Sequence, residues 1–199
     1  MQLMYINLHL TDIREKKIRD EIGINDALVI GNVGKLYAPK NHAFLLEVFH
    51  YIISKNGNAF LLLAGGGELE NSLKEKAFEL GIDDKMLFLG MRDDVSDIVQ
   101  AFDIFVFPST YEGLGLAVIE AQASGLKCIA SDCVPIETKV TDNIEYLSLD
   151  ESPVTWADAI LNLNIRNREE LSKQAMETIK ARGYDINFEA FKLEKIYRS

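Results

Sequence analysis

Residues 104–131 read IFVFPSTYEGLGLAVIEAQASGLKCIAS and contain one complete strand–helix–strand unit. The run Ile104–Phe107 is apolar without interruption, which is typical of a strand buried on both faces of a parallel sheet. The helical stretch that follows stops at Gly125, and a second candidate strand, Lys127–Ser131, comes next. Because parallel strands need a crossover connection, this order predicts a βαβ unit.

The same alternation extends in both directions along the chain. The predicted strands cover residues 28–33, 60–64, 86–89, 104–107, 127–131 and 145–147. Helical patterns occupy residues 12–22, 44–52, 69–80, 95–102, 116–123, 153–163, 168–182 and 188–197. Strands that alternate with helices predict an α/β fold with a doubly wound, parallel, six-stranded sheet of the Rossmann-like type. In such a sheet, ligands bind beyond the carboxyl ends of the strands.

Composition indicates one ordinary globular domain over residues 1–199. Hydrophobic residues make up 48% and charged residues 26%, which excludes a disordered or low-complexity chain. With 31 acidic against 21 basic residues the net charge is −10, and this balance argues against a nucleic-acid partner. We see neither a membrane-spanning run nor the basic start of a signal peptide, and the cysteines and histidines form no metal-binding pattern. We therefore expect a cytoplasmic protein without a structural metal.

Three loops that follow predicted strands carry candidate binding residues. After the first strand, Lys35 and Lys40 stand ahead of a helix, where two ammonium groups can hold a diphosphate. Two solvated loop lysines are the alternative. After the second strand, the glycine run 65–67 favours a tight turn, because the third glycine of a dinucleotide fingerprint is missing and the run follows the wrong strand. After the third strand, Arg92 has two alternatives: it faces a phosphate or base, or it pairs with a nearby aspartate.

The loop after the fourth strand offers the strongest candidate site. Glycines at the mouth of a helix leave backbone N–H groups free to bind an anion. Glu112 precedes the helix and Glu120 lies within it, so about 12 Å separates them and they cannot share one proton. They could instead bind two hydroxyl-bearing ends of one extended ligand. Glu120 interrupts an apolar stretch, and a solvated helix face is the alternative for it.

Together these motifs resemble one family. The Glu-x7-Glu pattern of Glu112 and Glu120 resembles the signature of the retaining GT-B glycosyltransferases of family 4, also called group 1. The Lys35-x4-Lys40 pair resembles that family's phosphate clamp, and residues 102–109, residues 125–132 and Glu137 match its flanking segments. The similarity runs from about residue 22 to residue 149. It implies the C-terminal, donor-binding half of a GT-B fold.

The resemblance also implies a role for each residue. Glu112 would contact the hydroxyls of the donor sugar, and Glu120 would hold the ribose. Lys35 and Lys40 would neutralise the departing diphosphate of a UDP- or GDP-sugar, without a metal. The other donor-binding residues would be Gly34, Gly113, Gly115 and Leu116 near the phosphates, and Met91 and Arg92 near the base. Lys35 departs from the Arg common at its position, so bidentate phosphate recognition is lost there.

The resemblance further implies a second, acceptor-binding domain that we do not find in this chain. The expected function is therefore donor binding in a hexosyltransferase that makes exopolysaccharide, capsule or another cell-surface glycan. Its acceptor would be a glycan or a lipid-linked sugar, and the missing domain could attach the enzyme peripherally to the membrane. The chain alone would be inactive. A nucleotide-binding module without catalysis is the alternative, and a NAD(P) oxidoreductase domain is a weaker one.

Overall fold

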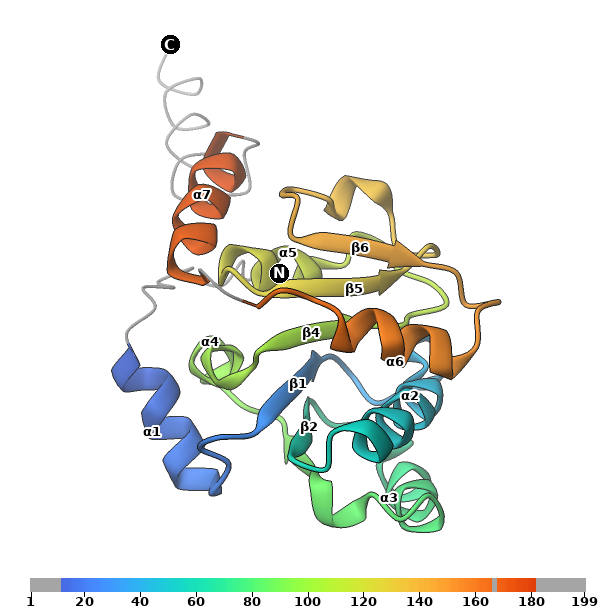
Figure 1. The fold of residues 1–199 in the computed structure, drawn as a ribbon. Coiled ribbons are helices and arrows are strands. Elements are labelled where there is room, and N and C mark those ends of the chain that lie inside the picture. Colours follow the sequence, from blue (N-terminus) through green and yellow to red (C-terminus); the bar gives the residue numbers. More distant parts are fainter. Residues whose placement is uncertain (1–11, 166–167, 182–199) are drawn as a thin grey trace.

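The structure is a computed structural model that describes residues 12–165 and 168–181. Within these residues, six parallel strands form a sheet in the order β3-β2-β1-β4-β5-β6 (Figure 1). The strands are β1 (Leu28–Val33), β2 (Ala59–Ala64), β3 (Met86–Gly90), β4 (Ile104–Phe107), β5 (Lys127–Ser131) and β6 (Ile144–Leu147). The predicted Rossmann-like sheet is confirmed, and every strand end lies within one residue of its predicted position.

Helices follow the strands as predicted. The α-helices are α1 (Asp12–Ile22), α2 (His42–Lys55), α3 (Glu70–Glu79), α4 (Val95–Ile98), α5 (Leu116–Ala123), α6 (Pro153–Leu161) and α7 (Arg168–Ala181). Short 3₁₀ turns are η1 (Ala38–Lys40), η2 (Asp83–Lys85), η3 (Val99–Ala101) and η4 (Ile136–Thr138). The helix predicted over residues 95–102 is divided between α4 and η3. The one predicted over residues 188–197 lies outside the described residues.

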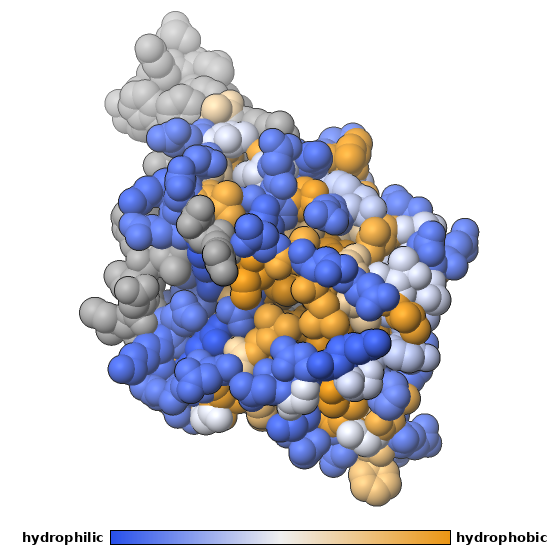
Figure 2. Space-filling view, viewed as in Figure 1, coloured by the Kyte–Doolittle hydropathy of each residue, from blue (hydrophilic) through white to orange (hydrophobic). Residues whose placement is uncertain are grey.

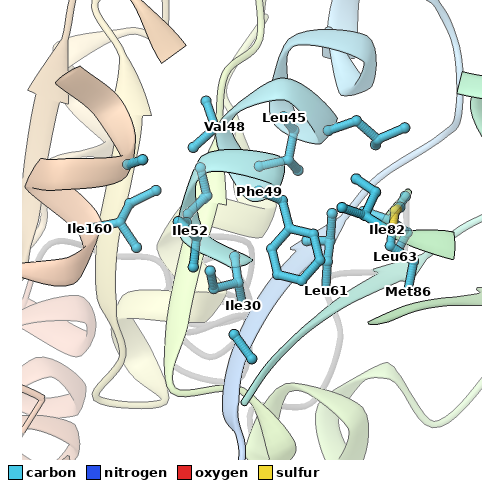
Figure 3. Close-up of a cluster of buried hydrophobic side chains, with 14 of the residues drawn as sticks. Ile30, Leu45, Val48, Phe49, Ile52, Leu61, Leu63, Ile82, Met86 and Ile160 are labelled. Atoms are coloured by element: carbon cyan, nitrogen blue, oxygen red, sulfur yellow. The ribbon is translucent and has the colours of Figure 1, made fainter. Parts of the chain in front are cut away.

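Alternate residues of the strands face two opposite layers of helices. On β2, Leu61 and Leu63 pack in a cluster with α2, α3 and α6, whereas Leu62 and Ala64 belong to a second cluster with α4 and α5. In the first cluster, the Phe49 ring of α2 lies toward Ile30 and Leu61 (Figure 3). This two-sided burial is why the strands read as uninterrupted apolar runs.

The outer surface of the first layer is mixed in polarity. Hydrophilic residues cover the rim of the face seen in Figure 2, and hydrophobic residues gather toward its middle, around α6 and β1. Three partly buried leucines of the first cluster, Leu28, Leu161 and Leu163, extend that cluster toward the surface. Among the described residues, no helix is long and apolar enough to cross a membrane.

Arg168, at the start of helix α7, connects this helix to the second layer. The buried guanidinium of Arg168 donates hydrogen bonds of 2.7–3.1 Å to four backbone carbonyls near the ends of η3 and α5, those of Val99, Gln100, Phe102 and Ser124. Burial lowers the pKa of Arg168 to about 10, so the side chain stays cationic at neutral pH. The carbonyl ends of helices carry partial negative charge, which suits this cation.

The direction of strand order reverses between β1 and β4, and the two strands separate there. They are paired only at Ile30 with Ile104 and at Gly31 with Phe105. A Cβ atom on Gly31 would lie 2.0 Å from the Phe102 ring, so only glycine fits at this point. Beyond it, the side chain of Asn32 spans the two strands and donates a 2.7 Å hydrogen bond to the Val106 carbonyl. This is the position at which doubly wound sheets form a ligand crevice.

Candidate functional site

The loop after β1 carries the two candidate clamp lysines. Its backbone is tied to the next loop, because Gly34 N donates to the Ala64 carbonyl at 2.9 Å and Leu36 N to the Gly66 carbonyl at 3.0 Å. The side chain of Leu36 is completely buried and anchors the loop in the first core cluster. The positions of the lysines are therefore set by neighbouring backbone.

The glycine run after β2 makes that close contact possible. A Cβ atom on Gly65 would lie 2.0 Å from the Gly34 carbonyl oxygen, and one on Gly67 would lie 2.2 Å from that of Leu36. Gly65 also has a φ of +142°, which a side chain would disfavour. The interpretation as a tight turn is confirmed. Its physical reason is the backbone contact between the two loops.

Lys40 lies in a nearly enclosed position beside Glu112. Its Nζ donates a hydrogen bond to Glu112 Oε1 and lies 4.4 Å from the centroid of the Phe107 ring. The stem of the lysine passes over Gly34, where an added Cβ would be 3.4 Å from Lys40 Cε. The side chains of Lys40 and Glu112 are only 13% and 10% exposed. The family resemblance implies separate roles for them, at the phosphate and at the sugar, and gives no sign of their contact.

Lys35 is placed quite differently. Its side chain is exposed, and its Nζ lies 5.8 Å from the centroid of the Tyr37 ring. Its ammonium makes no ion pair with any residue that the structure describes. One of the two candidate clamp cations is thus balanced by a carboxylate, and the other is open to solvent.

The start of helix α5 provides free backbone donors. Gly115 has a left-handed φ of +64° that turns the chain into the helix. Within the described residues, the N–H groups of Gly115, Leu116 and Ala117 donate to no protein acceptor. Gly113 lies in the exposed loop just before this turn. Free N–H groups are thus present at this helix start, and their role in binding an anion stays a prediction.

Glu120 lies one turn into α5 and is half-buried, not fully solvated. Burial raises the pKa of its carboxyl above the usual range. In the part of the chain that the structure describes, no hydrogen bond or ion pair compensates this carboxylate. A half-buried, uncompensated carboxylate is a good acceptor for ligand hydroxyl groups.

Gln122 of α5 fixes the backbone of residues 138–141. The sequence alone did not single it out. Its Nε2 donates to the Thr138 carbonyl at 2.7 Å, and its Oε1 accepts from Val140 N and from Thr141 N and Oγ1. The signal that could have found it is a second polar residue within the apolar stretch of α5. The methyl group of Thr138 in turn lies 3.2 Å from where a Cβ on Gly115 would be.

Met91 and Arg92 follow β3 at the same edge of the sheet. Met91 is 89% exposed and lies against Gly66, where an added Cβ would be 3.3 Å from its Cγ. The guanidinium of Arg92 donates twice to Asp94, at 2.7 and 2.6 Å, and holds the pKa of that carboxyl below its usual value. Of the alternatives for Arg92, the aspartate pair is the one present here. Its role at a nucleotide base stays a prediction.

A buried polar pair, His42 and Asn32, lies between the start of α2 and β1. The Nε2 of His42 lies 3.0 Å from Asn32 Oδ1, and because Asn32 Nδ2 already donates to Val106, Nε2 must carry the hydrogen. Burial, with a smaller contribution from Lys40, lowers the pKa of His42 to about 4. The neutral imidazole therefore ties the start of α2 to both β1 and β4. A polar residue inside the apolar run of β1 was the available sequence signal.

All these groups lie at the carboxyl ends of adjacent parallel strands, along one edge of the sheet (Figure 1). These strand ends carry two ammonium groups, the free N–H groups at the start of α5 and two carboxylates, of which Glu112 contacts Lys40. Among the described residues, no three His, Cys, Asp or Glu side chains gather as a metal site would require.

Comparison with known proteins identifies the family of this chain. The family model of the glycosyl transferases group 1 matches residues 27–164, which is more than half of the chain. The chain belongs to the group 1 glycosyltransferases. It is 35% identical over 176 residues to EpsF of Bacillus subtilis, whose name assigns it to the glycosyltransferases, and the match covers 86% of this chain and 45% of EpsF.

A second relative has a more specific name. It is the UDP-Gal:α-D-GlcNAc-diphosphoundecaprenol α-1,3-galactosyltransferase of Escherichia coli, 29% identical over 180 residues. That match covers 86% of this chain and 46% of the relative. The chain thus spans about half the length of the curated relatives it matches.

Solved structures show that the fold is that of a group 1 C-terminal domain. HepE of Anabaena, solved with UDP and glucose, superimposes with a TM-score of 0.78 at 18% identity, over 98% of this chain and 55% of HepE. The C-terminal domain of the group 1 protein LpcC of Francisella tularensis superimposes with a TM-score of 0.74 at 21% identity, over 90% of this chain and 96% of that domain. The predicted C-terminal half of a GT-B fold is confirmed.

Proposed function

We propose that this chain binds the nucleotide-sugar donor of a retaining glycosyltransferase. The diphosphate would lie between Lys35, Lys40 and the start of α5, the sugar at Glu112 and the ribose at Glu120. The observation that carries the proposal is the placement of these groups at the ends of β1 and β4, on either side of the point where strand order reverses. An extended ligand with a charged centre and hydroxyl groups at both ends suits this arrangement of charges.

The proposed chemistry follows from these charges. Transfer breaks the bond between the anomeric carbon and the diphosphate oxygen and forms one to the acceptor oxygen, whose proton can pass to the departing nucleoside diphosphate. Negative charge develops on that leaving group as the first bond breaks. Ammonium groups and helix N–H groups beside that position stabilise the developing negative charge. Lys35, Lys40 and the N–H groups of Gly115 and Leu116 would supply this stabilisation. We propose that they do so without a metal.

The named relatives support a particular donor and setting. The Escherichia coli relative takes UDP-galactose and a diphosphoundecaprenol-linked acceptor by its name, and HepE was solved with UDP and glucose. We therefore propose a UDP-sugar donor before a GDP-sugar, and a glycan or lipid-linked acceptor. Cell-surface glycan synthesis at the cytoplasmic side of the membrane is the corresponding proposal for the pathway.

The proposal is tested by calorimetric titration of UDP and GDP into lysine variants. Each charge-assisted phosphate contact is worth about 1.5–3 kcal/mol, so Lys35→Ala and Lys40→Ala should each bind the preferred nucleotide roughly tenfold more weakly or worse. Lys55→Ala is the matched control, because Lys55 is exposed at the opposite end of α2. Wild-type affinity in both loop variants would refute the assignment of the diphosphate site.

A transfer assay separates donor binding from catalysis. We propose that the 199-residue chain binds donor and transfers no sugar, because positioning an acceptor hydroxyl supplies ~7–11 kcal/mol in favourable cases and we assign that task to a further domain. Transfer to an added acceptor at rates typical of enzymes would contradict this. Absence of nucleotide binding would contradict the donor site itself.

A further inference from the structure

Three groups surround the side chain of Lys40. The Glu112 carboxylate accepts its hydrogen bond, the Phe107 ring lies 4.4 Å from its Nζ, and its stem runs over Gly34. The Lys40–Glu112 pair is largely withdrawn from water, with 13% and 10% of the two side chains exposed. Such a pair is screened less than a surface salt bridge, so it competes effectively with other partners of Lys40.

A diphosphate that binds at this position meets both members of the pair. It needs the Lys40 ammonium, which Glu112 already holds, and it brings its own negative charges beside the Glu112 carboxylate. Like charges placed together without compensation are unfavourable in a site of reduced polarity. When a free nucleoside diphosphate binds, the Glu112 carboxylate therefore either competes with it for Lys40 or is left without a partner.

An attached sugar changes this balance. Its hydroxyl groups can donate hydrogen bonds to Glu112 and replace those that the carboxylate loses when Lys40 turns to the phosphate. We propose that Glu112 sets the preference of the site for the intact sugar nucleotide over the free nucleoside diphosphate, by competing with the diphosphate for Lys40. This inference rests on the proposed function. After transfer, the Lys40–Glu112 ion pair forms again, and its formation favours release of the nucleotide.

The test is Glu112→Gln, titrated with UDP, UDP-glucose and UDP-galactose. The amide keeps the size of the side chain but loses the charge that competes for Lys40. UDP affinity should rise, on the order of tenfold, whereas affinity for the sugar nucleotides should stay or fall. Glu68→Gln is the matched control, because it removes one exposed carboxylate just after the glycine run, at the same end of the sheet. It should change neither affinity.

The double variant Lys40→Ala/Glu112→Gln tests whether the gain in UDP affinity depends on Lys40. In Lys40→Ala the gain in UDP affinity from Glu112→Gln should shrink, because no ammonium remains to be released. Glu112→Ser gives the same comparison if the glutamine variant does not fold, which a melting curve shows. UDP affinity that is unchanged or lower in a folded Glu112 variant overturns the inference, and so does an equal gain for UDP and both sugar nucleotides. A wild-type chain that binds neither UDP nor GDP overturns the proposed function as well, and this outcome is visible before any variant is compared.

Discussion

At the scale of single residues, the charge of Glu120 is expected to lower the stability of the fold and to strengthen ligand binding. Its carboxyl is half-buried, and burial raises its pKa, so the folded state disfavours the charged form at neutral pH. A charge kept at such a position without a protein partner is a cost to the fold, and this cost is present above the raised pKa. Residues of this kind cluster at functional sites.

The change Glu120→Gln should therefore separate the two effects. Removing the charge should leave the Tm at neutral pH equal to or above that of the wild type. It should also weaken UDP binding, roughly tenfold, because a ribose loses a charged acceptor worth about 1.5 kcal/mol or more. Calorimetry and thermal melts of the same samples measure both quantities. Glu145→Gln, an exposed change on β6, should alter neither. A variant that melts lower yet binds UDP normally would remove Glu120 from the site.

At the scale of elements, the His42–Asn32 pair joins α2 to β1, and the hydrogen bond from Asn32 to Val106 extends this connection to β4. The imidazole is buried with a pKa lowered to about 4, so folding selects its neutral form. Above pH 6.5 the histidine is neutral in the folded and the unfolded chain, and its full contribution is present. As the pH falls from 6.5 toward 4, the unfolded chain gains a proton that the folded chain does not, and stability is lost.

We predict that His42→Gln removes this pH dependence. The amide of glutamine can still donate to Asn32 but does not titrate. The wild type should lose up to about 3 kcal/mol of its free energy of unfolding between pH 6.5 and 4 through this residue, and the variant should lose correspondingly less. Denaturant unfolding at several pH values gives both slopes. His50→Gln, a change near the middle of α2, is the control and should keep the wild-type slope. Parallel slopes for wild type and His42→Gln would show that the buried pair is not responsible.

At the scale of the whole molecule, an acidic chain with a net charge of −10 is predicted to bind an anionic ligand. Attraction must then come from the local arrangement at the ends of β1 and β4, not from the overall field. Two observations support such an arrangement, namely the exposed ammonium of Lys35 and the free N–H groups at the start of α5.

UDP should stabilise the whole domain, and EDTA should not cancel the effect. At a concentration of about 100 times Kd, a ligand adds about 2.7 kcal/mol, which corresponds to a rise in Tm of roughly 5–10 °C for a chain of this size. Differential scanning fluorimetry with UDP, in EDTA and in Mg²⁺, measures it. Uridine lacks the diphosphate and should give a much smaller rise. A UDP effect that vanishes in EDTA and returns with Mg²⁺ would refute the metal-free proposal.

The positions of strands and helices were determined locally by the sequence. A run such as Ile104–Phe107 is apolar at every position because both of its faces are buried, and that property is written in four consecutive residues. The position of the loops after the strands was also predictable, because the carboxyl ends of parallel strands all lie at the same end of the sheet. The candidate site could thus be placed at that end before the structure was known.

Only the tertiary structure decided which side chains meet. Lys40 and Glu112 are 72 positions apart, and their contact depends on β1 and β4 being neighbours and on the glycine run that fixes the lysine loop. Two other sets of contacts depend likewise on how distant segments pack together. They are the hydrogen bonds from Arg168 to four carbonyls and the hydrogen bond between His42 and Asn32. Periodicity reports the burial of a residue relative to its neighbours in the chain. It carries no information on which distant side chain occupies the space opposite.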